Sequence, residues 1–465
     1  TGHMGLVPNM TVRYQEEKSM KKKALAICLA AALAASAFTA CGGKTPSSAA
    51  PGSTGAPAST ADKTVEITWW APPTFIQDGD DAAGTYEQTI IEAFEAKYPN
   101  IKVTLETIDF TNAGEKITAA IEGGTAADVL FDAPGRIIEY GKNGKLVSLD
   151  DMFTDDFVKD VNNNDLLSSC QGNGTYYMYP ISASPFYMAI NEKMWTDAGA
   201  MEFVNLEGDR SWTTENFEKA IEKLAAAGYN PGVLFCSGQG GDQGTRAFIN
   251  NLYGGSTANA DRTQYTFNSE EGIKALTKAQ EWIKKGWLGN GVAYNGGQSI
   301  ELFVAGTTSF EFCWGTSAAG NNAATMEANG VTPISLPFPS DDGKASLEYL
   351  VNGFCVFDNG DADKAEAAKT FIKFICDDSE WGPQNVIRTG AFPVRTSFGN
   401  LYPNDAEREL LAKFTTMYGP YYNTMDGFAN MRTEWWNMLQ VVTGGGDVTE
   451  AVNKAVEASN AGMAG

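Results

Sequence analysis

The chain has 465 residues, of which 43% are hydrophobic, and its formal net charge at pH 7 is −23. A body this acidic is repelled by nucleic acids and by anionic lipid surfaces, so the composition argues against nucleic-acid partners. The single histidine is His3. Residues 1–19 are mostly polar and precede Met20, and we interpret them as a non-native or mis-start extension. On that interpretation, the mature chain contains no histidine.

The lack of histidine removes much of the catalytic repertoire. Ser-His-Asp and Cys-His arrangements need an imidazole base, and histidine is the commonest protein ligand of transition metals. The cysteines lie too far apart for a zinc-binding pattern, and the chain has no Walker or dinucleotide-binding glycine motif. The sequence therefore predicts no metal and no cofactor. Glycoside hydrolysis, which needs only two carboxyl groups, remains as the enzymatic alternative.

An export signal follows the extension. Residues 21–23 are lysines, residues 24–38 form an apolar run, and small residues lead into Cys41. The run is shorter than the roughly 20 residues that span a bilayer, so residues 20–40 are predicted to be a cleaved signal peptide. The position of Cys41 resembles the lipobox of bacterial lipoproteins, although Phe38 stands where that motif usually has an aliphatic residue. An ordinary secretory signal with an incidental cysteine is the alternative.

Residues 41–63 consist mainly of Gly, Ser, Thr, Ala and Pro. This composition predicts a flexible linker with a reach of roughly 25 Å. The remaining chain is long enough for two domains.

The predicted elements of this folded body alternate between strand and helix. Residues 65–70, 101–105 and 128–131 have the composition of strands, and residues 86–98 and 116–121 have helical periodicity. A βαβαβ start indicates an α/β fold with right-handed crossovers. Further along, the pattern predicts a strand over residues 309–312 and helices over residues 214–227 (with Thr213 or Thr214 as N-cap), 269–285, 363–376, 425–442 and 448–459.

Eight landmark segments occur in a fixed order along this body: residues 65–70, 94–103, 121–129, 141–150, 176–180, 190–195, 211–217 and 390–395. In their order and spacing they resemble the extracellular solute-binding lipoproteins of carbohydrate ABC importers, the family that includes maltose-binding protein. The resemblance covers essentially the whole mature chain. It implies a periplasmic-binding-protein-like α/β fold, in which two lobes joined by a hinge of crossing segments close on a sugar.

The resemblance also implies how the chain divides and what it does. The crossings are expected near residues 179–184, 350–354 and 395–400. Lobe one would comprise residues 64–182 plus 350–396, and lobe two residues 183–349 plus 397–465. The implied protein is a monomeric binding subunit, not an enzyme, that is anchored to the outer face of the bacterial membrane through a lipid. It would bind a sugar or oligosaccharide and deliver it to the transmembrane permease subunits of an ABC transporter.

The implied site combines aromatic rings with polar side chains, because pyranose rings have apolar faces and many hydroxyl groups. Trp314 and Trp435 match cleft tryptophans of the family. Trp70 is preferred to Trp69 because it lies closer to the loop that follows its strand. The full predicted set is Trp70, Phe75, Asp132, Arg136, Ser184, Gln239, Asp242, Trp314, Asn352, Gly353, Phe354 and Trp435.

The loop at residues 132–136 departs from the pattern of maltose-binding protein. Arg136 is kept, whereas Asp132 replaces an aromatic residue and Gly135 replaces a carboxylate. This difference argues against a maltodextrin as the ligand. A helix N-cap is the competing interpretation of Asp132.

Two rival functions stay open. A secreted glycoside hydrolase would use two carboxylates, for instance among Asp109, Asp132 and Asp242. Alternatively, the same fold would bind a polyamine, a peptide or an iron chelate. Aromatic rings beside neutral hydroxyl partners would favour sugar, and an all-acidic cleft would favour a cation. Gln239 and Asp242 lie in a glycine-rich stretch that a plain turn would explain nearly as well.

The lipid anchor gives a first prediction. Cys41→Ser should release the protein from membrane fractions into the medium or periplasm, because diacylation requires the thiol. Fractionation followed by immunoblotting measures the distribution. A variant that stays membrane-bound in the absence of detergent would show that Cys41 is not the anchor.

Overall fold

The computed structural model of the chain describes residues 63–72, 74–75, 82–108, 113–238 and 240–464. The predicted signal peptide, Cys41, Asp109 and Gln239 lie outside the described residues. The segment Asp62–Gly465 forms one compact unit. Within the described ranges, no helix is long and apolar enough to cross a membrane.

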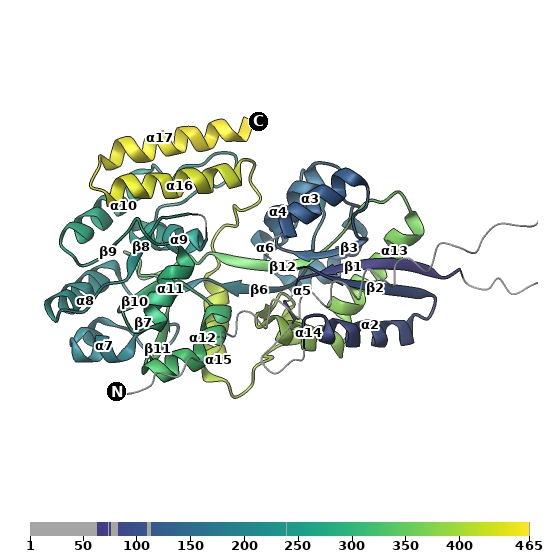
Figure 1. Ribbon diagram of the computed structural model, residues 1–465, viewed down its shortest axis with the longest axis horizontal. Helices are drawn as coiled ribbons and strands as arrows, with labels where there is room; N and C mark the ends of the chain where they lie inside the picture. Colours follow the sequence, from purple (N-terminus) through teal and green to yellow (C-terminus); the bar gives the residue numbers. More distant parts are fainter. Residues whose placement is uncertain (1–62, 73, 76–81, 109–112, 239, 465) are drawn as a thin grey trace, which may run out of the picture. The chain divides into compact units, whose positions relative to one another are not determined.

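A six-stranded mixed sheet organises the first part of this unit (Figure 1). Its strands are β1 (Val65–Ala71), β2 (Ile101–Thr107), β3 (Val129–Asp132), β6 (Tyr179–Pro185), β12 (Tyr349–Val356) and β13 (Phe392–Pro393). They lie in the order β13-β6-β12-β3-β1-β2. β1 is parallel to both β2 and β3, whereas β12 is antiparallel to β3 and β6. The predicted alternation of strands and helices at the start of the body is confirmed.

Helices cover both faces of this sheet: α2 (Thr85–Lys97) and α13 (Ala362–Asp377) on one face, α3 (Ala113–Gly123) and α4 (Pro134–Lys142) on the other. Trp69 of β1 packs edge-on against Phe371 of α13. Its neighbour Trp70 contacts Phe357, and the Lys116 ammonium of α3 lies 5.1 Å from its ring. Consecutive strand residues point to opposite faces, so the two tryptophans serve two different helix layers. Three further helices complete this part: α5 (Asp155–Val161), α6 (Asn164–Ser169) and α14 (Trp381–Thr389).

A three-stranded sheet organises the second part, with β7 (Tyr187–Asn191) between β10 (Phe310–Trp314) and β11 (Pro333–Leu336). A parallel pair, β8 (Val233–Phe235) and β9 (Gly289–Gly291), lies nearby. The surrounding helices are α7 (Glu192–Asp197), α8 (Thr214–Ala226), α9 (Asp242–Tyr253), α10 (Glu270–Lys284), α11 (Gly296–Val304), α12 (Thr316–Asn329), α15 (Ala406–Phe414), α16 (Phe428–Thr443) and α17 (Val448–Ala461). Most predicted helix ends lie within about three residues of these bounds, and Thr213 is the N-cap of α8, where its hydroxyl accepts from the Asn216 N–H.

Two separate hydrophobic cores lie on either side of β6 and β12. Tyr179 and Tyr349 belong to the core of the six-stranded sheet, whereas Tyr187 and Leu347 belong to the core around β7. β6 and β12 therefore carry the chain from one core to the other. The lobe boundaries predicted near residues 182 and 350 fall inside these strands and stay a prediction. Phe392 of β13, which pairs with β6, packs in the core around β7.

The two crossing strands approach each other closely at Gly353. A Cβ atom at this position would lie 2.4 Å from the Tyr179 carbonyl oxygen. The register of β12 against β6 shifts between Asn352 and Gly353. A side chain at residue 353 would force the strands apart, so the sequence needs glycine here.

Glu311 is a carboxyl group that is completely buried on β10. It accepts hydrogen bonds from the Ser299 hydroxyl and, at 2.7 Å, from the Cys313 N–H. Burial raises the pKa of Glu311 from 4.5 to about 7, against the opposing effect of these hydrogen bonds. Between these two pH values the Glu311 carboxyl group is therefore mostly protonated in the folded chain and mostly ionised in the unfolded chain.

This buried proton predicts a pH-dependent stability. Between about pH 4.5 and pH 7 the unfolded chain binds fewer protons at residue 311 than the folded chain, so this group lowers the free energy of unfolding as pH rises, by up to roughly 3 kcal/mol. In Glu311→Gln this contribution should disappear. The stability of the variant relative to wild type should then rise across that window in urea titrations. Glu301→Gln, on the exposed side of α11, is the matched control, and parallel profiles for wild type and E311Q would contradict the raised pKa.

Candidate functional site

The crossing strands present one partly exposed row of side chains. Ser184 of β6 lies in register with Leu350 of β12. Both are partly exposed, as are Asn352 of β12 and Phe186, which directly follows β6. Phe186 follows the strand and is the next partly exposed residue after Ser184. We call Ser184, Phe186, Leu350 and Asn352 the crossing face.

A carboxylate–guanidinium pair lies beside the crossing strands. Asp132 ends β3 and is paired in register with Gly353. The Arg136 Nε and Nη2 groups donate to the two Asp132 oxygens, both at 2.7 Å. Asp132 is buried, but 43% of the Arg136 side chain is exposed. The N-cap of α4 is Ala133, so Asp132 is not the N-cap of this helix. Asp132 instead orients the solvent-facing guanidinium of Arg136.

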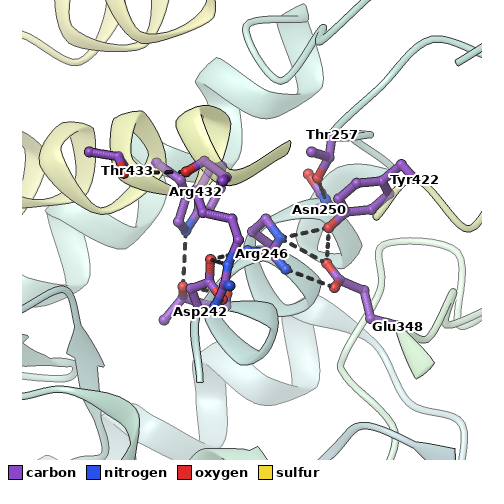
Figure 2. A network of polar contacts seen from close by, with 11 residues as sticks. Asp242, Arg246, Asn250, Thr257, Glu348, Tyr422, Arg432 and Thr433 are labelled. Atoms are coloured by element: carbon purple, nitrogen blue, oxygen red, sulfur yellow. Dashed lines mark hydrogen bonds and ion pairs between the residues drawn. The ribbon is translucent and has the colours of Figure 1, made fainter. Parts of the chain in front are cut away.

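A second polar group lies where α9 begins. Asp242, the first residue of α9, accepts from Arg246 and also from the Arg432 Nε and Nη2 groups of α16, both at 2.9 Å (Figure 2). Only 2% of the Asp242 side chain is exposed, against 27% for Arg432. Asp242 was predicted to contact ligand hydroxyls directly, but the structure buries it and engages both of its oxygens with arginines. In this arrangement Asp242 orients the Arg432 guanidinium.

Arg246 continues this network towards β12. On its other side it donates to Glu348, at 3.2 and 3.3 Å, and to the Tyr422 hydroxyl at 2.7 Å (Figure 2). Although burial lowers the pKa of Arg246, the charges of Asp242 and Glu348 hold it well above its ordinary value. The Glu348 backbone carbonyl accepts from the Phe186 N–H at 2.8 Å. The network therefore attaches α9 and α16 to the crossing face.

The two tryptophans that were expected to stack on sugar lie in the core around β7. Trp314 and Trp435 are each 1% exposed. Trp314 packs edge-on against Phe303, and the Trp435 indole N–H donates to the Thr245 hydroxyl at 3.0 Å. Stacking requires an accessible ring face, which neither residue presents in this structure. Their part in binding a ligand stays a prediction.

The aromatic residues predicted from the first lobe are also buried. Trp70 is 3% exposed, and its indole N–H donates to Glu106 at 2.9 Å. Phe75 and Phe354 are completely buried, and both contact Trp69. These three side chains are packed into the sheet and its helix layers, so the structure does not present them as a ligand surface. Gly353 is explained by the close approach of the crossing strands.

Of the twelve residues predicted to bind ligand, Arg136 is exposed and Ser184 and Asn352 are partly exposed, and all three lie on or beside the crossing strands. Sequence reasoning missed five residues of this region: Phe186, Arg246, Glu348, Tyr422 and Arg432. The spacing of four between Asp242 and Arg246 would have pointed to an ion pair on one helix. Among the described residues, no three His, Cys, Asp or Glu side chains are grouped to hold a metal ion.

The chain is similar in sequence to a known protein family and to several relatives. A family model described as bacterial extracellular solute-binding protein matches residues 78–378. Binding proteins of Brucella abortus and Brucella suis are 30% identical over 116 residues, a match that spans 25% of this chain and 28% of theirs.

Two solved structures illustrate the similarity in fold. A cyclic α-maltosyl-1,6-maltose binding protein of Arthrobacter globiformis has a TM-score of 0.71 and 19% identity, over 86% of this chain and 99% of its own. An ABC substrate-binding protein of Listeria monocytogenes in complex with cycloalternan has a TM-score of 0.64 and 20% identity, over 86% of this chain and 100% of its own.

The buried network yields a stability prediction. Arg246→Met should lower the free energy of unfolding by about 3–5 kcal/mol, because it leaves Glu348 buried without its cation and leaves Asp242 paired with Arg432 alone. Lys219→Met is the matched control, since it breaks a pair with Glu215 of the same spacing on the exposed face of α8, and should cost less than about 1 kcal/mol. Urea denaturation measures both. Equal losses would show that burial does not govern the strength of the Arg246 network.

Proposed function

The chain belongs to the bacterial extracellular solute-binding protein family, and we propose that it binds a neutral sugar or oligosaccharide at the crossing face and delivers it to an ABC permease. The proposal draws on family membership and on two solved structures of the same fold, one in complex with cycloalternan and one named as a cyclic α-maltosyl-1,6-maltose binding protein. It is carried by the balance of charge around the crossing face.

Three carboxylates, Asp132, Asp242 and Glu348, are matched there by three guanidinium groups, Arg136, Arg246 and Arg432. A region balanced in this way suits a neutral ligand better than a polyamine or an anion, because neither kind of ion would find a compensating net charge. A neutral ligand must instead be recognised by hydrogen bonds and by apolar contacts.

The crossing face and its neighbours offer the groups that a sugar needs. The Arg136 guanidinium, the Asn352 amide and the Ser184 hydroxyl provide donors and acceptors for sugar hydroxyls. The partly exposed ring of Phe186 provides an apolar surface for the C–H face of a pyranose. A Cβ atom at Gly315, the N-cap of α12, would lie 3.8 Å from Phe186, so the N–H groups at the start of that helix lie near this ring.

In this proposal the protein binds the sugar without catalysing a reaction on it. Asp132 and Asp242, the described members of the carboxylate set for a glycoside hydrolase, are each bound to guanidinium groups and buried. In our proposal they orient arginines rather than attack a glycosidic bond. Binding would draw the lobes together by rotation about β6 and β12, and the closed form would dock on the permease. The protein would act as a monomer held at the membrane by a lipid on Cys41.

A carbohydrate panel tests the proposal. Thermal shift should show at least one sugar or oligosaccharide that stabilises the protein, because a ligand that binds only the native state raises its apparent stability. Arg136→Ala should weaken binding of that sugar by about 1–3 kcal/mol, the range for hydrogen bonds to a charged group. Lys102→Ala, a cation of similar exposure (48%) on β2, should leave the affinity unchanged.

Chromatography of the bound sugar after a day of incubation distinguishes binding from hydrolysis. One equivalent should be recovered unaltered. Turnover to shorter sugars beyond one equivalent would refute the binding-protein assignment. In the thermal-shift panel, stabilisation by polyamines but by no sugar would refute the proposal that the ligand is a sugar.

A further inference from the structure

The chain makes a further passage between the two cores after α15. Phe414 of α15 packs in the core around β7, Tyr421 packs in the core of the six-stranded sheet, and Tyr422 returns to the core around β7. We call residues 418–426 the strap. Because the elements before and after it belong to the core around β7, the strap reaches out to the core of the six-stranded sheet and comes back.

Three tyrosine rings seat the strap at the start of β12. The Tyr418 ring lies on the Tyr349 ring, with centroids 4.1 Å apart and planes at 11°, and the Tyr421 ring meets Tyr349 edge-on at 5.1 Å. The Gly419 N–H donates to the Leu347 carbonyl oxygen at 2.9 Å, which attaches the strap to the segment that leads into β12. These contacts bury aromatic surface, so they favour the seated strap.

Two cations add polar links between the two sides of the molecule. Lys142 of α4, beside the six-stranded sheet, donates to Asp426 of the strap at 2.8 Å. Arg262, between α9 and α10, donates to the Tyr421 carbonyl oxygen at 3.1 Å and to the Ser168 hydroxyl of α6 at 2.7 Å. Each link joins an element beside one core to a segment anchored in the other. A rotation of the two sides about β6 and β12 would therefore strain or break these links.

The seating of the strap also carries a cost. The hydroxyl groups of Tyr349 and Tyr418 are buried, and among the described residues neither has a hydrogen-bond partner. A buried hydroxyl without a partner raises the free energy of the seated form, and release of the strap would return the Tyr418 hydroxyl to water. The unpaired hydroxyls therefore reduce the advantage of the seated strap over a released one.

We propose that the strap opposes lobe closure and so sets the apparent affinity for the ligand, an inference that rests on the proposed function. The strap is seated in an arrangement that leaves the crossing face partly exposed, and it loosens when the lobes close. It is joined to the candidate site, because the Tyr422 hydroxyl accepts from Arg246 at 2.7 Å (Figure 2). Since apparent affinity scales with the fraction of molecules able to close, a looser strap gives tighter binding.

Lys142→Met tests the strap without altering the crossing face. It removes the link to Asp426, so the sugar identified in the panel should bind up to about tenfold more tightly, the fold-change for one hydrogen bond. Arg262→Met removes the second link and should act in the same direction. Lys278→Met is the matched control, because Lys278 has a similar exposure (25% against 23%) and pairs with Glu218 on the same side of the molecule. The affinity of K278M should equal that of wild type.

Tyr418→Phe should act in the opposite direction. It removes an unpaired hydroxyl and keeps the stacked ring, so the strap should seat more firmly. The free energy of unfolding should then rise, and the apparent affinity for the sugar should fall. Urea denaturation and isothermal titration calorimetry measure the two quantities. Tighter sugar binding by Y418F, or weaker binding by K142M, would refute the proposal.

Small-angle scattering of the free proteins separates this inference from the proposed function. Without any ligand, K142M and R262M should be more compact than wild type, and K278M should not. If wild type binds no sugar in the panel, the proposed function fails and this compaction alone decides the role of the strap. If wild type binds a sugar but K142M and R262M match it in affinity and compactness, the strap is refuted and the proposed function stands. Where a sugar binds, a change in one of the two measurements without the other also refutes the strap.

Discussion

The burial of the Arg246 guanidinium is the constraint on which the arrangement of the candidate site depends. A buried cation must be surrounded by acceptors, and here they come from α9, from the segment before β12 and from Tyr422. Guanidinium donors are directional, so these elements can meet in few relative orientations. Removing one partner of a buried ion pair lowers the free energy of unfolding by much more than the intact pair contributes to it. The network therefore specifies geometry more than it adds net stability.

Much of the fold could be predicted because its signals are local. The βαβαβ start, the N-cap at Thr213 and the long helices near the C-terminus follow from periodicity and capping within short windows of sequence. The two long crossing strands were located through the resemblance to a family rather than from periodicity. The polar residues Arg136, Ser184 and Asn352 were predicted in the same way and stay predictions.

The direction in which side chains point could not be predicted, because it depends on distant partners. Asp242 looked suited to ligand hydroxyls until Arg432, 190 residues further along the chain, was seen to occupy it. The register of β10 against β7 shifts between Glu311 and Trp314. This shift disturbs the alternation of side chains along the strand, from which the direction of the Trp314 ring would be predicted. A tryptophan that matches a family pattern in sequence still packs wherever its neighbours leave room.

The matched charges around the crossing face have a kinetic consequence. The chain as a whole is strongly acidic, yet an uncharged solute feels no force from that field and meets the protein by diffusion alone. Salt screens exposed charges, so the rate of capture should hardly respond to ionic strength. For a protein of the cell envelope, which faces whatever salinity the surroundings impose, uptake would then follow solute concentration rather than the composition of the medium.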